Sequence, residues 1–156
     1  PHDAAARDRI AYDEILAGQV ALMLLRSSLR ARRGRAVVGD GRLSGRLQLP
    51  FAPTGAQRRV IAEIAADMAQ STPMLRMLQG DVGSGKTLVA LHAMLAAVEA
   101  GHQAALLAPT EILARQHFAT LQRLAAGTGV EIAILTGRDK GRAREATLMG
   151  LADGSV

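Results

Sequence analysis

Residues Gly80 to Thr87 read GDVGSGKT, and this stretch decides the fold. It satisfies the pattern GxxxxGKT, with a short apolar run before it (74–79) and an apolar segment after it (86–100). A strand before this pattern and a helix after it are the context in which such a loop binds nucleotide phosphates. The sequence therefore predicts a phosphate-binding loop between a strand and a helix.

The residue types in this loop suit the chemistry of phosphate binding. Glycines let the backbone amides of residues 81–86 turn inward toward phosphate oxygens, and the start of the next helix adds partial positive charge. Lys86 would neutralise the β and γ phosphates, and the Thr87 hydroxyl would ligate a bridging Mg²⁺. Lys86 is one of only two lysines, which favours a specific need for a compact charge there. The alternative is a glycine-rich turn that contains Lys and Thr by chance.

Strand and helix signals alternate around this loop, which indicates an α/β fold. Thr54 and Gln57 form a capping box ahead of a helix. Alternating elements of this kind form right-handed βαβ units around a parallel sheet, although three core strands are few for such a sheet. The predicted helices cover 55–70, 86–100, 111–126 and 142–152, and the predicted strands cover 74–79, 104–108 and 130–135.

The first fifty residues have a different pattern. Apolar residues at helical spacing predict one long helix over 3–30, and we expect the chain to begin partway through a longer protein. Residues 31–50 are rich in Arg and Gly and predict a linker or a weak hairpin. Seven arginines and one acid between residues 26 and 46 give this stretch a charge of +6. They would either bind phosphates or form a solvated connector. We expect two parts, 1–46 and 47–156.

Composition excludes several classes of protein. The chain has 156 residues, of which 49% are hydrophobic and 21% charged, as in an ordinary soluble domain. It has no Cys, which excludes disulfides and Cys-ligated metal sites and is compatible with a reducing cytosol. Its apolar runs are far shorter than the roughly 20 residues that span a bilayer, so no membrane partner is expected. The net charge of +5 favours a polyanionic partner.

The sequence lacks part of the set of residues needed to hydrolyse a nucleotide. Hydrolysis requires an acid for Mg²⁺ and water, usually at the end of a later strand, and no apolar strand ending in Asp-Glu follows the loop. Asp139, Glu145 and Asp153 fall in predicted loops or helices, where they are expected to be surface acids.

Five blocks of sequence, in order along the chain, resemble the RecG branched-DNA helicases of helicase superfamily 2. They are RIAYDEILAGQVALMLLR (9–26), LPFAPTGAQ (49–57), MLQGDVGSGKTLVALHAMLAAVEAG (77–101), ALLAPTEILARQH (105–117) and LTGRDKGRAR (135–144). The resemblance implies a three-layer RecA-like P-loop NTPase fold with an incomplete parallel sheet, preceded by a long N-terminal helix. Residues 1–46 would be the connector helix and Arg-rich linker from a wedge domain, and 47–156 the first part of the ATP-binding motor domain.

The resemblance also implies a function for the parent protein. It would be an ATP- and Mg²⁺-dependent DNA helicase or translocase, acting as a monomer in the bacterial cytoplasm on the nucleoid. Its substrates would be branched double-stranded DNA, such as stalled forks and Holliday junctions, in recombination and repair. The fragment alone is expected to be inactive, because the later motifs are absent from it.

The resemblance assigns roles to individual positions. Gln57 would read the adenine edge, with helix capping as a compatible alternative, and Phe51 would stack on the base, with a core position as the alternative. Pro53 stands where many members have Leu. The expected ATP-binding residues are Phe51, Gln57, Gly80, Asp81, Val82, Gly83, Ser84, Gly85, Lys86 and Thr87.

Two loops are expected to contact DNA by the same resemblance. Pro109 and Thr110 precede a predicted helix, and simple capping by Thr110 is the alternative. Thr136, Gly137 and Arg138 follow the next predicted strand, where a solvated helix start is the alternative. His117 is expected to be a packed or surface residue.

Three other functions remain open from the sequence. A transcription-repair coupling translocase is disfavoured by Ser84, where that family typically carries an aromatic residue, and by the 9–26 block. A noncatalytic phosphate-loop module would bind nucleotide without turnover. A basic DNA-binding module would bind DNA without any dependence on nucleotide.

Overall fold

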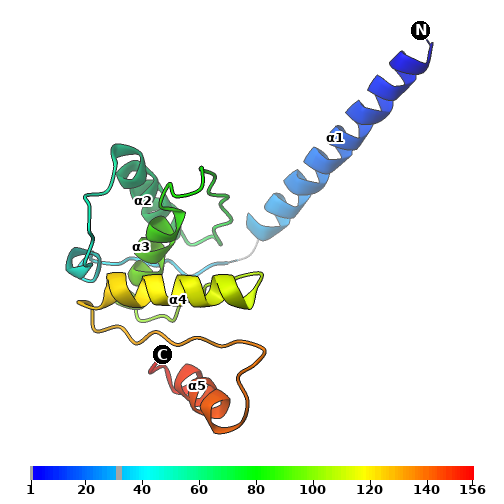
Figure 1. Ribbon diagram of the computed structural model, residues 1–156. Coiled ribbons are helices and arrows are strands. Elements are labelled where there is room, and N and C mark those ends of the chain that lie inside the picture. Colours follow the sequence, from blue (N-terminus) through cyan, green and yellow to red (C-terminus); the bar gives the residue numbers. More distant parts are fainter. Residues whose placement is uncertain (1, 31–32) are drawn as a thin grey trace. The chain divides into compact units, whose positions relative to one another are not determined.

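The computed structural model describes residues 2–30 and 33–156 and contains five α-helices and one short 3₁₀ helix within them (Figure 1). The helices are α1 (His2–Arg30), α2 (Gly55–Met68), α3 (Lys86–Glu99), α4 (Glu111–Ala125) and α5 (Gly141–Asp153), with the 3₁₀ helix η1 (Ser44–Arg46) before α2. These bounds confirm the predicted helices to within two residues at each end.

The chain divides into two compact units. The first comprises the described residues up to Ala36 together with Gln70–Met77, and the second comprises Val37–Ala69 and Leu78–Val156. The second unit contains the whole phosphate loop. The predicted division into a connector (1–46) and a motor segment (47–156) is a functional assignment, and it stays a prediction.

In the first unit, α1 is the long helix predicted from the sequence. Its apolar side chains are exposed, including Ile10, Ile15 and Met23 at 62–67%. Arg9 forms an ion pair with Asp13 one turn later, with 3.2 Å between Nε and Oδ2. The Gly34 amide donates a 2.8 Å hydrogen bond to the Ser71 carbonyl within the same unit.

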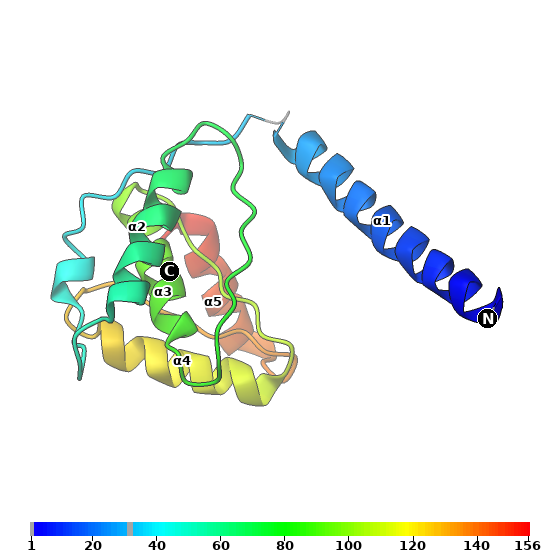
Figure 2. The ribbon, with the colours of Figure 1, turned by 90° about the horizontal axis from the view of Figure 1, so that it is seen from above.

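In the second unit, α3 supplies most of the core. Figures 1 and 2 show α3 running beside α2 and meeting α4. Leu91 and Leu95 of α3 cluster with Leu121 and Leu124 of α4, and Leu95 is 2% exposed. Leu88 and Val89 are also buried on α3. The helix that directly follows the phosphate loop is therefore packed into the core of this unit.

The segment predicted as a linker packs onto this core from residue 37 onward, while residues 31 and 32 lie outside the described residues. The Glu99 carboxylate at the end of α3 accepts hydrogen bonds from the amides of Gly41 (2.8 Å) and Leu43 (2.5 Å). Leu43, Leu47 and Leu49 pack against the core cluster. This part of the Arg-rich stretch is docked rather than a free connector.

Local signals explain where the helices begin and end. The Thr54 side chain accepts from the Gln57 amide, and the Gln57 side chain accepts from the Thr54 amide, which confirms the predicted capping box. Gly101, which follows the C-cap residue Ala100 of α3, has a φ of +78° that suits glycine at a helix end.

The three predicted strands are not formed in the described part of the chain. Residues 74–79, 104–108 and 130–135 run as segments without regular structure, so the sheet stays a prediction. A parallel strand is stable when neighbouring strands pair with it and helices cover both faces. Leu107, on the second of these segments, is 97% exposed. No helix among the described residues has the length and apolarity to span a bilayer.

Replacing Leu95 by Ala is expected to lower the free energy of unfolding by about 2–5 kcal/mol, because it leaves a cavity beneath α3. Urea unfolding followed by circular dichroism measures this change. Leu24→Ala removes the same atoms from an exposed site on α1, where the side chain is 66% exposed, and is expected to change stability by no more than about 0.5 kcal/mol. Equal effects of the two variants would contradict the described core.

Candidate functional site

The phosphate loop turns tightly before α3. Gly83 and Gly85 have φ values of +81° and +83°, in the left-handed region that favours glycine. The Ser84 amide donates to the Asp81 carbonyl at 3.2 Å and closes the turn. Residues 81–84 are exposed, and Val82 at the tip is fully so. The loop therefore presents its backbone to solvent at the start of a helix.

Lys86 folds across this loop. Its Nζ donates hydrogen bonds to the carbonyl oxygens of Gly80 (2.7 Å) and Asp81 (2.8 Å). A Cβ on Gly80 would lie 2.7 Å from Ser84 Oγ, so a side chain at this position would displace the Ser84 hydroxyl. The ammonium group and the open backbone thus converge where phosphate oxygens are expected, and these residues fit a bound nucleotide.

Gln57 links α2 to the loop, a contact that the sequence did not predict. Its Oε1 accepts from the Thr54 amide at 2.8 Å, and its Nε2 donates to the Ser84 carbonyl at 2.9 Å. A Cβ added to Gly85 would collide with this Nε2. The capping role of Gln57 is confirmed, and its adenine-reading role stays a prediction.

Phe51 lies in the segment before α2 with 56% of its surface exposed. The alternative of a core position is therefore wrong for this residue. Stacking on an adenine ring stays a prediction.

Thr87 contacts a histidine that carries no predicted role in the site. Its Oγ1 lies 3.5 Å from Nδ1 of His117 on α4, and both side chains are half-buried. His117 is thus a packed residue, as expected, but it packs against the predicted Mg²⁺ ligand. No sequence signal joins the two positions, because they lie 30 residues apart on different helices.

At the start of α4, Thr110 acts as a cap. Its Oγ1 accepts from the Leu113 amide at 3.3 Å, which confirms the capping alternative. Pro109 and Thr110 precede the helix, and Thr110 is exposed. A contact between these two residues and DNA stays a prediction.

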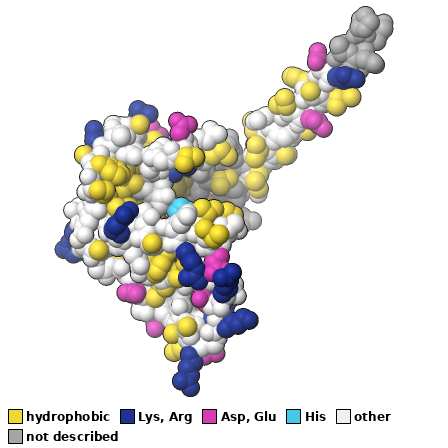
Figure 3. Space-filling model, viewed as in Figure 1, with side chains coloured by type: hydrophobic (Ala, Val, Ile, Leu, Met, Phe, Trp, Pro, Cys, Tyr) yellow, Lys and Arg dark blue, Asp and Glu magenta, His cyan; other side chains and the backbone are white. Residues whose placement is uncertain are grey.

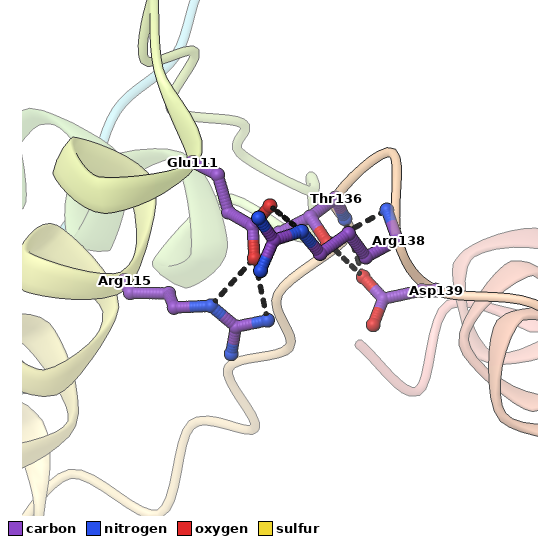
Figure 4. Close-up of polar contacts among 5 residues, drawn as sticks. All are labelled: Glu111, Arg115, Thr136, Arg138 and Asp139. Carbon is purple, nitrogen blue, oxygen red and sulfur yellow. Dashed lines mark hydrogen bonds and ion pairs between the residues drawn. The ribbon is translucent and has the colours of Figure 1, made fainter.

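The loop before α5 is shaped by Thr136 and Asp139. The buried Thr136 donates to Asp139 Oδ2 through its amide (2.5 Å) and its hydroxyl (2.8 Å), as Figure 4 shows. These hydrogen bonds hold the pKa of Asp139 below its ordinary value of 3.8, the backbone bond being the larger cause. The Thr136 side chain therefore works inside the turn, while Gly137 and Arg138 are exposed.

Glu111 brings the two predicted DNA-binding loops together. Its Oε1 contacts Nε (3.0 Å) and Nη2 (2.9 Å) of Arg115 on the same helix, and its Oε2 contacts Nε of Arg138 at 3.0 Å (Figure 4). No prediction from the sequence included Glu111. The spacing of Glu111 and Arg115 is a helical signal for an ion pair, but the contact with Arg138 has no local signal.

On the face that Figure 3 shows, the basic side chains do not form one continuous field. The face of the molecule in Figure 3 carries Lys and Arg at several separate places, with acidic and apolar groups between them. Among the described residues, no group of three or more His, Cys, Asp or Glu is arranged to hold a metal ion.

Comparisons with known proteins agree with this geometry. The family model described as DEAD/DEAH box helicase matches residues 54–153. The chain is similar to the ATP-dependent DNA helicase RecG of Escherichia coli O127:H6, with 45% identity over 153 residues, which is 97% of this chain and 22% of that protein. RecG of Acidithiobacillus ferridurans is 47% identical over the same shares of the two chains.

The chain spans about a fifth of the length of these curated relatives. A solved structure described as RecG bound to a three-way DNA junction is similar to this chain, with a TM-score of 0.82 and 39% identity. The match covers 94% of this chain and 20% of that one.

Gly85→Ala is expected to destabilise the chain, because a side chain there is strained by the positive φ and collides with Gln57. Thermal unfolding of three variants separates these causes. Gly137→Ala, in open space and without a positive φ, should be near neutral. Gly83→Ala has a positive φ in open space and should lose about 1 kcal/mol or more from strain alone, with a larger loss for Gly85→Ala. Equal losses at 83 and 85 would argue against the Gln57 contact.

The turn at 136–139 is expected to weaken in acid. Because the pKa of Asp139 is lowered in the fold, its contribution is present above pH 3.8 and is lost as the pH falls through the lower, folded-state pKa. Carboxyl-carbon NMR should place its titration midpoint below 3.8, and Thr136→Val should move the midpoint upward. The midpoint of Asp153, which Ser155 lowers through separate hydrogen bonds, should stay in place. An Asp139 midpoint at or above 3.8 would contradict the described turn.

Proposed function

The chain belongs to the DEAD/DEAH box helicase family, and from this premise we propose that it binds ATP and branched DNA as part of a RecG-type helicase. The family implies ATP binding and a RecA-like α/β fold. The observation that carries the proposal is the loop at 80–87, where Lys86 and open backbone groups converge at the start of α3. The similarity to RecG proteins over 97% of the chain supports the same function.

ATP would lie with its phosphates in the loop and its base near the start of α2. The expected contacts are the backbone of residues 80–85, the Lys86 ammonium, the Gln57 amide and the Phe51 ring. Thr87 would hold Mg²⁺ through its hydroxyl. When bound, this ion neutralises charge on the β and γ phosphates. Lys86 would exchange its bonds to the Gly80 and Asp81 carbonyls for bonds to phosphate oxygens.

In the proposed sheet, the phosphate loop and the two loops expected to contact DNA would lie at one edge. Residues 74–79, 104–108 and 130–135 would pair as parallel strands between helical layers, with the phosphate loop and the loops at 109–110 and 136–138 following them. Loops that follow parallel strands lie at the same edge of the sheet, where α/β proteins bind ligands. The TM-score of 0.82 to a RecG structure supports this architecture.

Branched DNA is the proposed nucleic-acid partner. The similar solved structure is described as RecG bound to a three-way DNA junction. The proposed contacts on this chain are Pro109, Thr110, Thr136, Gly137 and Arg138. Glu111 joins the two loops that carry them, which supports one shared surface.

The proposal extends to the whole protein. It would use ATP to move along double-stranded DNA at stalled forks or Holliday junctions in recombination and repair. It would act as a monomer in the bacterial cytoplasm, associated with the nucleoid. Residues 1–46 would connect a wedge domain to the motor that begins at residue 47.

The described residues alone are proposed to bind ATP without hydrolysing it. Asp139 is engaged by Thr136, and Asp153 accepts a 2.9 Å hydrogen bond from the Ser155 amide. Glu145 is exposed on α5. Asp139 and Asp153 form hydrogen bonds within local turns, and Glu145 faces solvent. The acid for hydrolysis is therefore expected elsewhere in the longer helicase.

Titration of this chain with a fluorescent ATP analogue and Mg²⁺ is expected to give saturable binding. Lys86→Ala should abolish it, because the phosphates lose their principal counter-charge. Lys140→Ala is the matched control: it removes the only other lysine, which lies outside the loop, and should bind as the unmodified chain does. Fluorescence anisotropy measures the binding, and released phosphate measures turnover.

The other outcomes separate the functional classes. Absence of saturable binding in the unmodified chain would count against a competent loop in these residues. Steady turnover lost in Lys86→Ala would overturn the statement that the catalytic acid lies elsewhere.

A further inference from the structure

The acid at the start of α4 is out of place on a surface expected to bind DNA. Glu111 lies directly after Thr110 and carries a charge that repels phosphate. The helix start stabilises an acid, but any Glu or Asp in the first turn would satisfy that preference. Its contacts with two arginines give a more specific reason for this residue.

Glu111 is the least exposed member of this cluster. Its side chain is 25% exposed, against 56% for Arg115 and 83% for Arg138. The Glu111 side chain is therefore more buried than the side chain of either arginine. Asp139, whose pKa Arg115 and Arg144 also lower, belongs to the same group of charges, so two acids and three arginines leave a net charge of +1.

The geometry leaves the outer edge of Arg138 free. Glu111 contacts its Nε at 3.0 Å, while the Arg138 side chain is 83% exposed. Arg115 directs Nε and Nη2 to the other carboxylate oxygen. Each oxygen of Glu111 thus contacts one arginine, as the dashed lines in Figure 4 mark.

An arginine fixed in this way is suited to binding a phosphate. A guanidinium has five N–H donors in a planar fork, and an acid on its inner edge leaves the outer donors available. Fixing the side chain in advance reduces the conformational entropy lost when the phosphate binds. The carboxylate costs some attraction through its charge, which screening by salt reduces.

We propose that Glu111 is a positioning residue for DNA binding: it holds Arg138 and Arg115 so that their outer nitrogens face one backbone phosphate. This inference rests on the proposed DNA-binding function and deepens it. It assigns the phosphate to the junction of the loops at 109–111 and 136–138, with Arg138 as its principal contact.

The test asks whether removing the Glu111 side chain strengthens or weakens the binding of DNA. Binding of a fluorescently labelled three-way DNA junction to the 156-residue chain is measured by anisotropy at fixed low salt. Glu111→Ala makes the chain more positive by one unit, so charge alone predicts tighter binding. Positioning predicts weaker binding by several-fold, because the two arginines lose their support.

Glu145→Ala is the matched control, since it makes the same change in charge at an exposed site on α5 outside the cluster. It is expected to bind as tightly as the unmodified chain or slightly more tightly. Arg138→Ala should weaken binding, and adding Glu111→Ala to it should cause a smaller further loss than Glu111→Ala causes in the unmodified chain, because only the support of Arg115 is then lost.

Glu111→Gln is a control for a local loss of structure at the start of α4 in Glu111→Ala. Its amide oxygen accepts from one arginine only, so binding is expected to fall between that of the unmodified chain and Glu111→Ala. Thermal unfolding of each variant identifies any that fail to fold.

Two results would overturn this inference and leave the proposed function standing. One is that Glu111→Ala binds DNA at least as tightly as Glu145→Ala. The other is that Glu111→Ala causes the same loss of DNA binding whether or not Arg138 is present. Absence of DNA binding by the unmodified chain would overturn the proposed DNA role of these loops together with this inference.

Discussion

Burial of one face of α3 is the constraint on which the rest of the second unit depends. Leu88, Val89, Leu91 and Leu95 are buried within the first ten residues of this helix. Because α3 begins at Lys86, the same burial fixes the last residues of the phosphate loop in space. The docked segment at 37–49 and the helix α4 both pack against it. A flexible glycine-rich loop thus has a rigid base, which is a general requirement for a site whose ligand contacts come mainly from the backbone.

The sequence predicted every α-helix, because the signals that begin and end helices are local. Thr54 and Gln57 are three residues apart, and Gly101 lies two residues after the last residue of the helix it ends. The phosphate loop was equally visible, since its function requires glycines and a lysine at fixed spacing. The docking of residues 37–49 was missed because the carboxylate that holds them, Glu99, lies more than fifty residues later. An Arg- and Gly-rich composition predicts a linker when no such distant partner is visible.

The contacts that define the candidate site are mostly long-range, and no sequence pattern predicted them. The contacts between Gln57 and Ser84, Thr87 and His117, and Glu111 and Arg138 each join residues about thirty positions apart. Their geometry follows from how the helices pack, which no local pattern specifies. The sheet is the opposite case: its apolar segments are recognisable locally, but strands form only when neighbours satisfy their backbone groups. Exposed Leu107 marks a segment whose pattern predicts a strand that lacks such neighbours here.

The two hydrogen bonds of the Gln57 amide have a consequence for selectivity among bases. One end of this amide closes the cap of α2, and the other anchors the phosphate loop. A base that hydrogen-bonds to this amide would break both bonds. The free energy gained would be that of the new hydrogen bonds minus that of the two lost. Adenine offers a donor and an acceptor side by side and can replace both. A base that matches only one end leaves an unpaired group and gains nothing from the exchange. Under the proposed role of Gln57, a base would therefore compete with the cap of α2 and with the phosphate loop for the two ends of the same amide.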